Sequence, residues 1–183
     1  MKEWLDGLVA GNPEDRLAAT EAILEAGAAA IERGGAATDG LSSLPELAGE
    51  YAEPLARVFT QEHLLVRSAA YLCLKAMGQA AGGALAHLVE GLEDPRGEVR
   101  ACSAELLGSL KGSADPAADA LLLALCDEGR EDVREPVARV LADMARRQPE
   151  LKRRLEDLVR DERPYCRDSA RLALGLSAGV EEP

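Results

Sequence analysis

Aromatic residues make up only 3% of this 183-residue sequence, although 47% of its residues are hydrophobic. The core must therefore be built mainly from leucine, alanine and valine. Such a composition favours closely packed helices over a β-sandwich, which would need more valine, isoleucine, tyrosine and threonine. The chain is long enough to form one domain with a substantial core.

The sequence also lacks a surplus of positive charge. It contains 21 Lys and Arg residues against 33 Asp and Glu residues, which gives a net charge of −12. This balance disfavours general binding to nucleic-acid phosphates and docking on an anionic membrane. The simplest interpretation of the acidic surface is that it keeps the protein soluble.

Long apolar runs are absent as well. No stretch approaches 18 uncharged apolar residues, so we expect no membrane-spanning helix. The first residues, 1–6, lack a basic region followed by an apolar run, so we expect no signal peptide. These features predict a cytoplasmic protein without membrane contact.

Residue patterns for known chemistry are missing too. Cys73, Cys102, Cys126 and Cys166 are widely spaced and form no CxxC motif. We expect reduced thiols that pack as small apolar residues. The two histidines, His63 and His87, have no partner at metal-ligand spacing. No nucleophile elbow, phosphate loop, zinc motif or calcium loop occurs. We therefore predict a protein that is not an enzyme and has no cofactor.

What the sequence does contain is an internal repeat. Arg67, Arg100, Arg134 and Arg167 each open an apolar helical run, at intervals of 33, 34 and 33 residues. A leucine follows each arginine after seven residues and precedes it by twelve, which supports the same register independently. These leucines are Leu74, Leu107, Leu141 and Leu174, and Leu55, Leu88, Leu122 and Leu155. Each copy has room for two helices.

A fifth, divergent copy lies at the N-terminus, with Arg16 in the arginine position. Arg67 follows 51 residues later, which leaves an insertion of 18 residues. The glycine-rich stretch after residue 33 is expected to be a flexible loop, and Pro45 to open a short helix after it. Gly27 aligns with Gly78 and is expected to end its helix.

The predicted organisation is a single domain spanning residues 1–183. Repeat 1 covers about 2–33, the loop insertion about 34–46, repeats 2–5 about 47–177, and a short tail 178–183. Pro54 is expected to break the first helix of repeat 2 or to delay its start.

The repeat combines an acidic turn, a Val-Arg pair and a helix of leucine and small residues. It resembles HEAT repeats, and more narrowly the short HEAT-like repeats named after phycobilisome lyases. The resemblance covers most of residues 2–177 and implies an all-α, right-handed α-solenoid of about five helix pairs. Asp94, Glu128 and Asp161 stand six residues before their arginines, as in the ladder of Asp–Arg contacts that links neighbouring repeats in this family. Repeat 2 departs from the ladder, because it has Gln61 in that position.

Helical geometry separates two stripes on each second helix. The predicted core stripe holds Val66, Ala70, Cys73, Leu74 and Met77 in repeat 2, and Val133, Val137, Val140, Leu141 and Met144 in repeat 4. In a HEAT-like solenoid the opposite stripe lines the concave surface. Its residues are the predicted partner-binding set: Ser68, Tyr71, Leu72, Lys75, Ala101, Glu105, Gly108, Glu135, Arg139, Ala142, Arg146, Asp168, Arg171 and Leu172.

The leading hypothesis is a non-catalytic scaffold or adaptor that binds a helix or peptide of another protein on this surface. The resemblance leaves two alternatives open: a subunit of an enzyme like the bilin lyases, or a nucleic-acid-binding HEAT-like protein. The second is disfavoured, because the inner stripe mixes acidic and basic residues. Residues 146–154 form the densest basic stretch, which we interpret as a solvated helix end. Partner identity, oligomeric state and any role of the insertion stay open.

Overall fold

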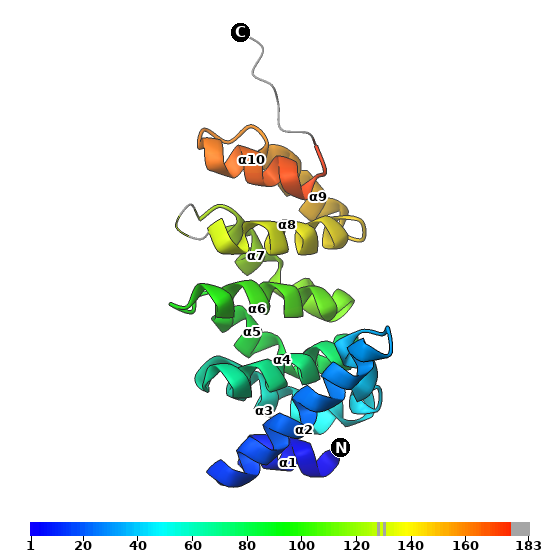
Figure 1. Ribbon diagram of the computed structural model, residues 1–183. Coiled ribbons are helices and arrows are strands. Elements are labelled where there is room, and N and C mark those ends of the chain that lie inside the picture. The colour runs from blue at the N-terminus through cyan, green and yellow to red at the C-terminus, as the bar shows by residue number, and fades with distance from the viewer. Residues whose placement is uncertain (128, 130, 177–183) are drawn as a thin grey trace. The chain divides into compact units, whose positions relative to one another are not determined.

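The computed structural model describes residues 1–127, 129 and 131–176, and all regular structure in them is helical. The chain divides into two compact units, Met1–Glu90 and Gly91–Pro183. In the described residues the helices follow one another as five pairs (Figure 1). The predicted all-α solenoid of about five helix pairs is confirmed.

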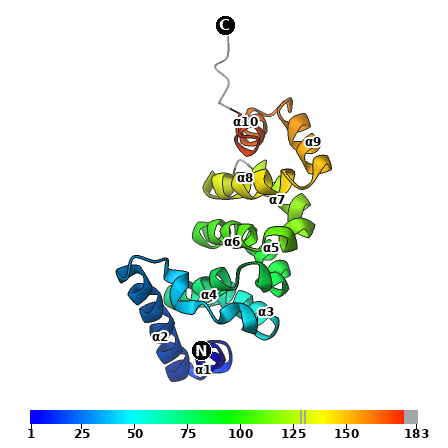
Figure 2. The ribbon, with the colours of Figure 1, turned by 90° about the vertical axis from the view of Figure 1, so that its right-hand side faces the viewer.

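The first unit contains the two N-terminal pairs and the beginning of the third. Its α-helices are α1 (Lys2–Ala10), α2 (Pro13–Glu32), α3 (Ala48–Gln61), α4 (Leu64–Met77) and all but the last residue of α5 (Leu85–Gly91). Short 3-10 helices connect them: η1 (Ala37–Leu41), η2 (Leu44–Leu47) and η3 (Gly78–Ala84). Helix α3 packs on α4, and α2 packs on α1 and also lies against α4 (Figure 2).

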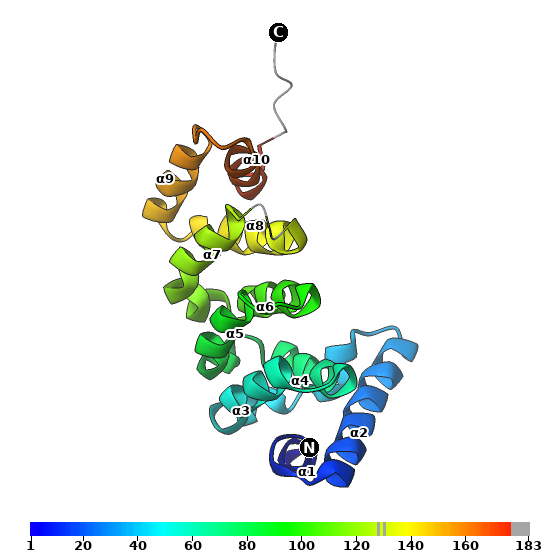
Figure 3. The same cartoon turned by 90° about the vertical axis from the view of Figure 1, so that its left-hand side faces the viewer.

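The second unit holds the remaining pairs. Its elements are α6 (Gly97–Ser109), η4 (Lys111–Ala117), α7 (Ala118–Leu125), α8 (Glu131–Ala145), α9 (Pro149–Leu158) and α10 (Pro164–Ala173). The second helices α6, α8 and α10 form one row, in which α8 packs against both neighbours (Figure 3). Helices α7 and α9 lie along the other side of this row.

Local sequence explains the start of α2, the longest of these helices. The Asn12 side chain accepts hydrogen bonds from the backbone N–H groups of Glu14 and Asp15, at 2.9 and 3.0 Å. Pro13 occupies the first turn, where its missing N–H leaves no bond unmade. Such a cap is worth about 1 kcal/mol.

Three local expectations for the first unit are wrong. The stretch expected to be a flexible loop forms η1 and η2, because Leu41 and Leu44 are fully buried and anchor it. Helix α2 continues through Gly27, which is itself buried in the helix. Helix α3 runs unbroken through Pro54. The lost hydrogen bond at Pro54 is outweighed by the large apolar face that α3 buries.

The start of η2 agrees with expectation, since Pro45 stands in its first turn. Gly78 ends α4 with a φ of 53°, in the half of conformational space that glycine reaches without steric cost.

The predicted core stripe is buried. In α8, Val133, Val137, Leu141 and Met144 are at most 1% exposed, and Val140 is also buried. In α4 the corresponding residues Ala70, Cys73, Leu74 and Met77 are buried, and Val66 is half-buried. Burying each leucine or valine contributes about 1.5–3 kcal/mol, so these stripes account for much of the stability.

The expectation of four reduced thiols is wrong. Cys126, at the end of α7, forms a disulfide with Cys166 in the first turn of α10, with the two Cα atoms 4.7 Å apart. The sequence did not indicate this pair, because 40 residues separate the two cysteines. Cys73 and Cys102 lie outside this disulfide. Burial raises the pKa of the Cys73 thiol to about 12, so this thiol stays protonated and unreactive near neutral pH.

We expect reduction of Cys126–Cys166 to destabilise the protein, because the bond removes conformational entropy from the unfolded chain. For a loop of this length the loss is about 4 kcal/mol. Thermal denaturation with and without dithiothreitol measures it. The matched control is the Cys126→Ala/Cys166→Ala variant, whose midpoint should not respond to the reductant. Titration of the oxidised, denatured protein should find two free thiols; four would contradict the disulfide.

Candidate functional site

The repeat arginine Arg100 links two neighbouring repeats. Its guanidinium donates to the carbonyl oxygens of Asp94 and Pro95, at 2.8 and 3.1 Å, and so ties down the turn before α6. The same side chain makes two hydrogen bonds to the carboxylate of Asp132 in α8, at 2.7 and 3.1 Å. The arginine register therefore has a structural cause.

Arg16 and Arg167 repeat parts of this arrangement. Arg16 donates to the carbonyl of Leu8 and pairs at 2.8 Å with Glu62, which belongs to the next repeat. Arg16 thus links its own helix pair to the next one, as Arg100 does. Arg167 donates to the carbonyls of Asp161 and Glu162, as Arg100 does to its own turn.

The expected ladder of Asp–Arg contacts uses other atoms than the family resemblance implies. The carboxylate of Asp94 binds Arg96, two residues later, and that of Asp161 binds Arg163 in the same way. The backbone carbonyls of these aspartates accept hydrogen bonds from the repeat arginines Arg100 and Arg167. The predicted third member, Glu128, lies outside the described residues. The family resemblance found the right positions but not the contacts.

Arg134 holds the corresponding position in α8 and meets α10 through an aromatic ring. Its guanidinium lies 5.0 Å from the ring centre of Tyr165. Burial raises the pKa of the Tyr165 hydroxyl. This cation–π contact joins the last two repeats.

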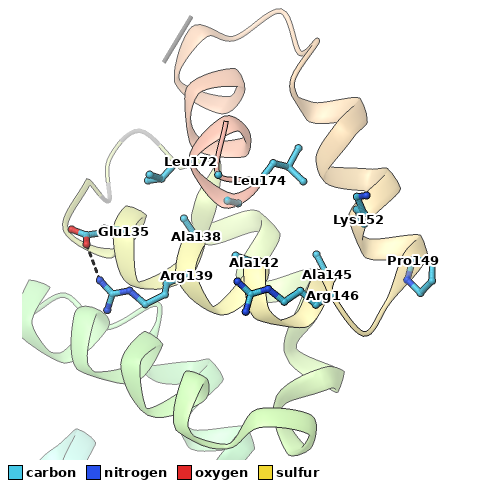
Figure 4. A pocket seen from close by; sticks show the side chains of 12 residues that line it. Glu135, Ala138, Arg139, Ala142, Ala145, Arg146, Pro149, Lys152, Leu172 and Leu174 are labelled. Carbon is cyan, nitrogen blue, oxygen red and sulfur yellow. Dashed lines mark hydrogen bonds and ion pairs between the residues drawn. The ribbon is translucent and has the colours of Figure 1, made fainter. Parts of the chain in front are cut away.

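An open groove of about 820 Å³ lies between α8 and the end of α10, closed at one end by the turn into α9 (Figure 4). Its α8 side is lined by Glu135, Ala138, Arg139, Ala142, Ala145 and Arg146. Pro149 and Lys152 line it from the first turn of α9, and Leu172, Ala173, Leu174 and Gly175 line the α10 side. All of these residues belong to the second unit. We call this surface the α8–α10 groove.

The groove brings together five residues of the predicted partner-binding set: Glu135, Arg139, Ala142, Arg146 and Leu172. Sequence reasoning missed Pro149 and Lys152 in the first turn of α9, because the predicted stripe was drawn on the second helices alone. It also missed Ala138, Ala145, Ala173 and Leu174, which lie beside that stripe on or next to α8 and α10. Asp168 is exposed and Arg171 half-buried in α10, but neither lines the groove.

In α6, part of the predicted partner-binding set packs against the neighbouring helix α8. A Cβ atom added to Gly108 would come within 3.0 Å of the Val140 side chain in α8. The glycine therefore permits close packing of α6 on α8, and this packing compensates for its cost in the helix. Ala101 is half-buried and Glu105 is exposed.

In the first unit the predicted set is only partly open, because α2 lies over α4. Leu72 reaches within 3.5 Å of where a Cβ atom on Gly27 of α2 would stand, and Ser68 is half-buried. The Lys75 ammonium donates to the Tyr71 hydroxyl at 2.6 Å. The expectation that this stripe forms an open inner surface fails here, since the tilt of α2 was not readable from the sequence.

Several arginines of the basic stretch 146–154 form ion pairs with carboxylates. Arg147 bonds to Asp143 and reaches Asp115 of the preceding repeat at 3.2 Å. Arg154 likewise reaches Asp119 at 2.7 Å. These exposed pairs are worth about 1 kcal/mol or less each, and they fit the interpretation of this stretch as a solvated surface.

Residues 1–127, 129 and 131–176 contain no group of three potential metal ligands. In the same residues every helix falls short of the length and apolar character that crossing a bilayer requires.

Helix pairs in register, joined by repeat arginines, define a helical repeat protein with the all-α solenoid fold. Residues 85–175 match the family model of HEAT repeats. This part of the chain therefore consists of HEAT repeats, as the sequence predicted. The narrower resemblance to phycobilisome-lyase repeats stays a prediction. No curated protein matches the sequence.

Solved structures agree on the fold. The chain is similar to a designed armadillo repeat protein in complex with the peptide (KR)4, with a TM-score of 0.54 over 94% of this chain and 97% of the other. An engineered protein gives 0.53, with 95% and 94% covered. A computationally designed armadillo repeat protein for modular peptide recognition gives 0.51, with 94% and 97% covered. Each is 16% identical to this chain, so the likeness concerns the fold.

Replacing Arg100 by alanine is expected to destabilise the protein by about 1–3 kcal/mol, because two carbonyls and a carboxylate lose a charged donor. Chemical denaturation of the purified variant measures the change. Arg139→Ala is the matched control: it removes an exposed arginine that pairs with Glu135 one turn earlier in α8, and it should change stability by less than about 0.5 kcal/mol. Equal losses in the two variants would contradict the role of Arg100.

Asp161 offers a test by titration. Hydrogen bonds from the Arg163 side chain and backbone lower the pKa of Asp161 from its ordinary value to about 2. Because the folded-state pKa is depressed, the interaction stabilises the fold fully above about pH 4 and is lost as the pH falls towards 2. NMR titration should show Arg163→Gln raising this pKa, with Arg153→Gln as the control. An unchanged pKa in Arg163→Gln would contradict the assignment.

Proposed function

We propose that the protein is a non-catalytic interaction scaffold and that the α8–α10 groove binds a peptide segment of another protein. The observation that carries the proposal is the groove itself, an open channel with an apolar floor and charged rims. Its small floor residues, Ala138 and Ala142, leave room for a ligand backbone, and Leu172 offers an apolar contact.

The fold supports a peptide as the occupant. Two of the similar solved structures are armadillo repeat proteins, one in complex with a peptide and one designed for modular peptide recognition. Repeat proteins with stacked helix pairs present extended surfaces suited to such ligands. The groove lies on the row of second helices, where the sequence predicted a partner to bind.

A peptide-display selection against the full chain tests the proposal. We expect enriched peptides that lose binding to Ala142→Glu, because the larger side chain fills the middle of the groove. Leu123→Glu is the matched control. It places a glutamate at an exposed position of α7 in the second unit, outside the groove, and this variant should retain binding. Circular dichroism should show both variants folded. Selected peptides that bind Ala142→Glu as well as the unmodified chain would overturn the proposal.

A further inference from the structure

The charges around the α8–α10 groove are opposite in balance to those of the chain. The protein carries a net charge of −12. The groove is lined by three basic side chains, Arg139, Arg146 and Lys152, and by one acidic side chain, Glu135. A local excess of positive charge on an acidic protein identifies the sign of the ligand that this surface favours.

The basic side chains can turn to a ligand at little cost. Arg139 pairs with Glu135 at 2.7 Å, and Arg146 with Asp143 at 3.8 Å, but the two arginine side chains are 68% and 79% exposed. Lys152 pairs at 3.6 Å with Glu156 on the surface of α9. Exposed pairs of this kind contribute about 1 kcal/mol or less, so a ligand carboxylate competes readily with them.

The spacing of the arginines suits a short peptide. Arg139 and Arg146 are separated by two helical turns and lie along the same side of α8, with Ala142 between them (Figure 4). Seven residues of helix correspond to about 10 Å, a distance that carboxylates on one short segment can span. Each guanidinium can bind a carboxylate through two hydrogen bonds.

The opposite wall supplies the apolar part of the site. Leu172 is 44% exposed, and it faces the groove together with Leu174, across from Ala138 and Ala142 (Figure 4). An apolar side chain of a ligand would be covered by this wall, while its neighbours reached the arginines. Burial of one leucine side chain contributes about 1.5–3 kcal/mol.

We infer that the groove recognises an acidic peptide segment that also carries leucine or a similar apolar residue. This inference rests on the proposed function and adds the chemistry of the partner. Carboxylates of the segment bind Arg139 and Arg146 along α8, and its apolar side chains pack between Ala142 and Leu172. Lys152 attracts the end of the segment that reaches the α8–α9 turn.

The probe for the test is a fluorescein-labelled octapeptide, (Glu-Leu)4, with (Lys-Leu)4 as its charge-reversed partner. Fluorescence anisotropy with the full, oxidised chain measures binding at low and at moderate salt. We expect the dissociation constant for (Glu-Leu)4 to be at least tenfold lower than for (Lys-Leu)4. Non-specific attraction to this acidic protein would favour the basic peptide, so the expected preference can arise only from a local basic site.

Two double variants with the same change in net charge assign the binding to the groove. Arg139→Glu/Arg146→Glu should weaken (Glu-Leu)4 binding at least tenfold and strengthen (Lys-Leu)4 binding. Arg57→Glu/Arg153→Glu alters exposed arginines outside the groove and should leave both affinities within about twofold. Higher salt should weaken the binding of the acidic peptide to the unmodified chain.

The outcomes separate the two proposals. Equal binding of the two peptides, or equal losses of affinity in the two double variants, would overturn the inference that the partner is acidic. If displayed peptides still depended on Ala142, the groove would stand as a peptide site and only the ligand's charge would be wrong. If no selected peptide depended on Ala142, the proposed function itself would fail.

Discussion

The hydrogen-bonding of a single arginine side chain is the constraint on which the repeat depends. Arg100 satisfies the carbonyls of its own turn and the carboxylate of the next repeat at once. Both sets of contacts require an arginine in the first turn of the second helix, on the side that faces its own turn and the next repeat. This requirement explains why the spacing holds at 33 or 34 residues while most other positions vary.

The same constraint places the α8–α10 groove. Repeat arginines and aspartates occupy one end of each second helix, where Arg134 meets Tyr165 and Arg100 meets Asp132. Side chains on the remaining stripe of α8 are not needed for these links or for the buried core. They are therefore available for recognition, and here they carry Arg139, Ala142 and Arg146.

Much of the fold was predictable from the sequence, because the repeat period and the spacing of apolar residues along a helix can be read from the order of residues alone. The leucines at fixed offsets from the arginines identified the helix pairs, and the core residues of α8 followed from helical geometry. The tilt of α2, the buried turns at Leu41 and Leu44 and the Cys126–Cys166 pair did not follow. Each depends on which distant residues meet in space. Five of the twelve residues that line the groove were predicted, because α8 and α10 share the repeat register, whereas Pro149 and Lys152 lie on a first helix.

The disulfide has a consequence for the integrity of the chain. Its two sulfur atoms close a covalent ring that runs from Cys126 to Cys166 and contains all of α8 and α9. A protease that cuts one peptide bond inside this ring leaves the two fragments joined. The arginine-bearing wall of the groove thus stays attached to α10 after a nick, until a reductant opens the ring.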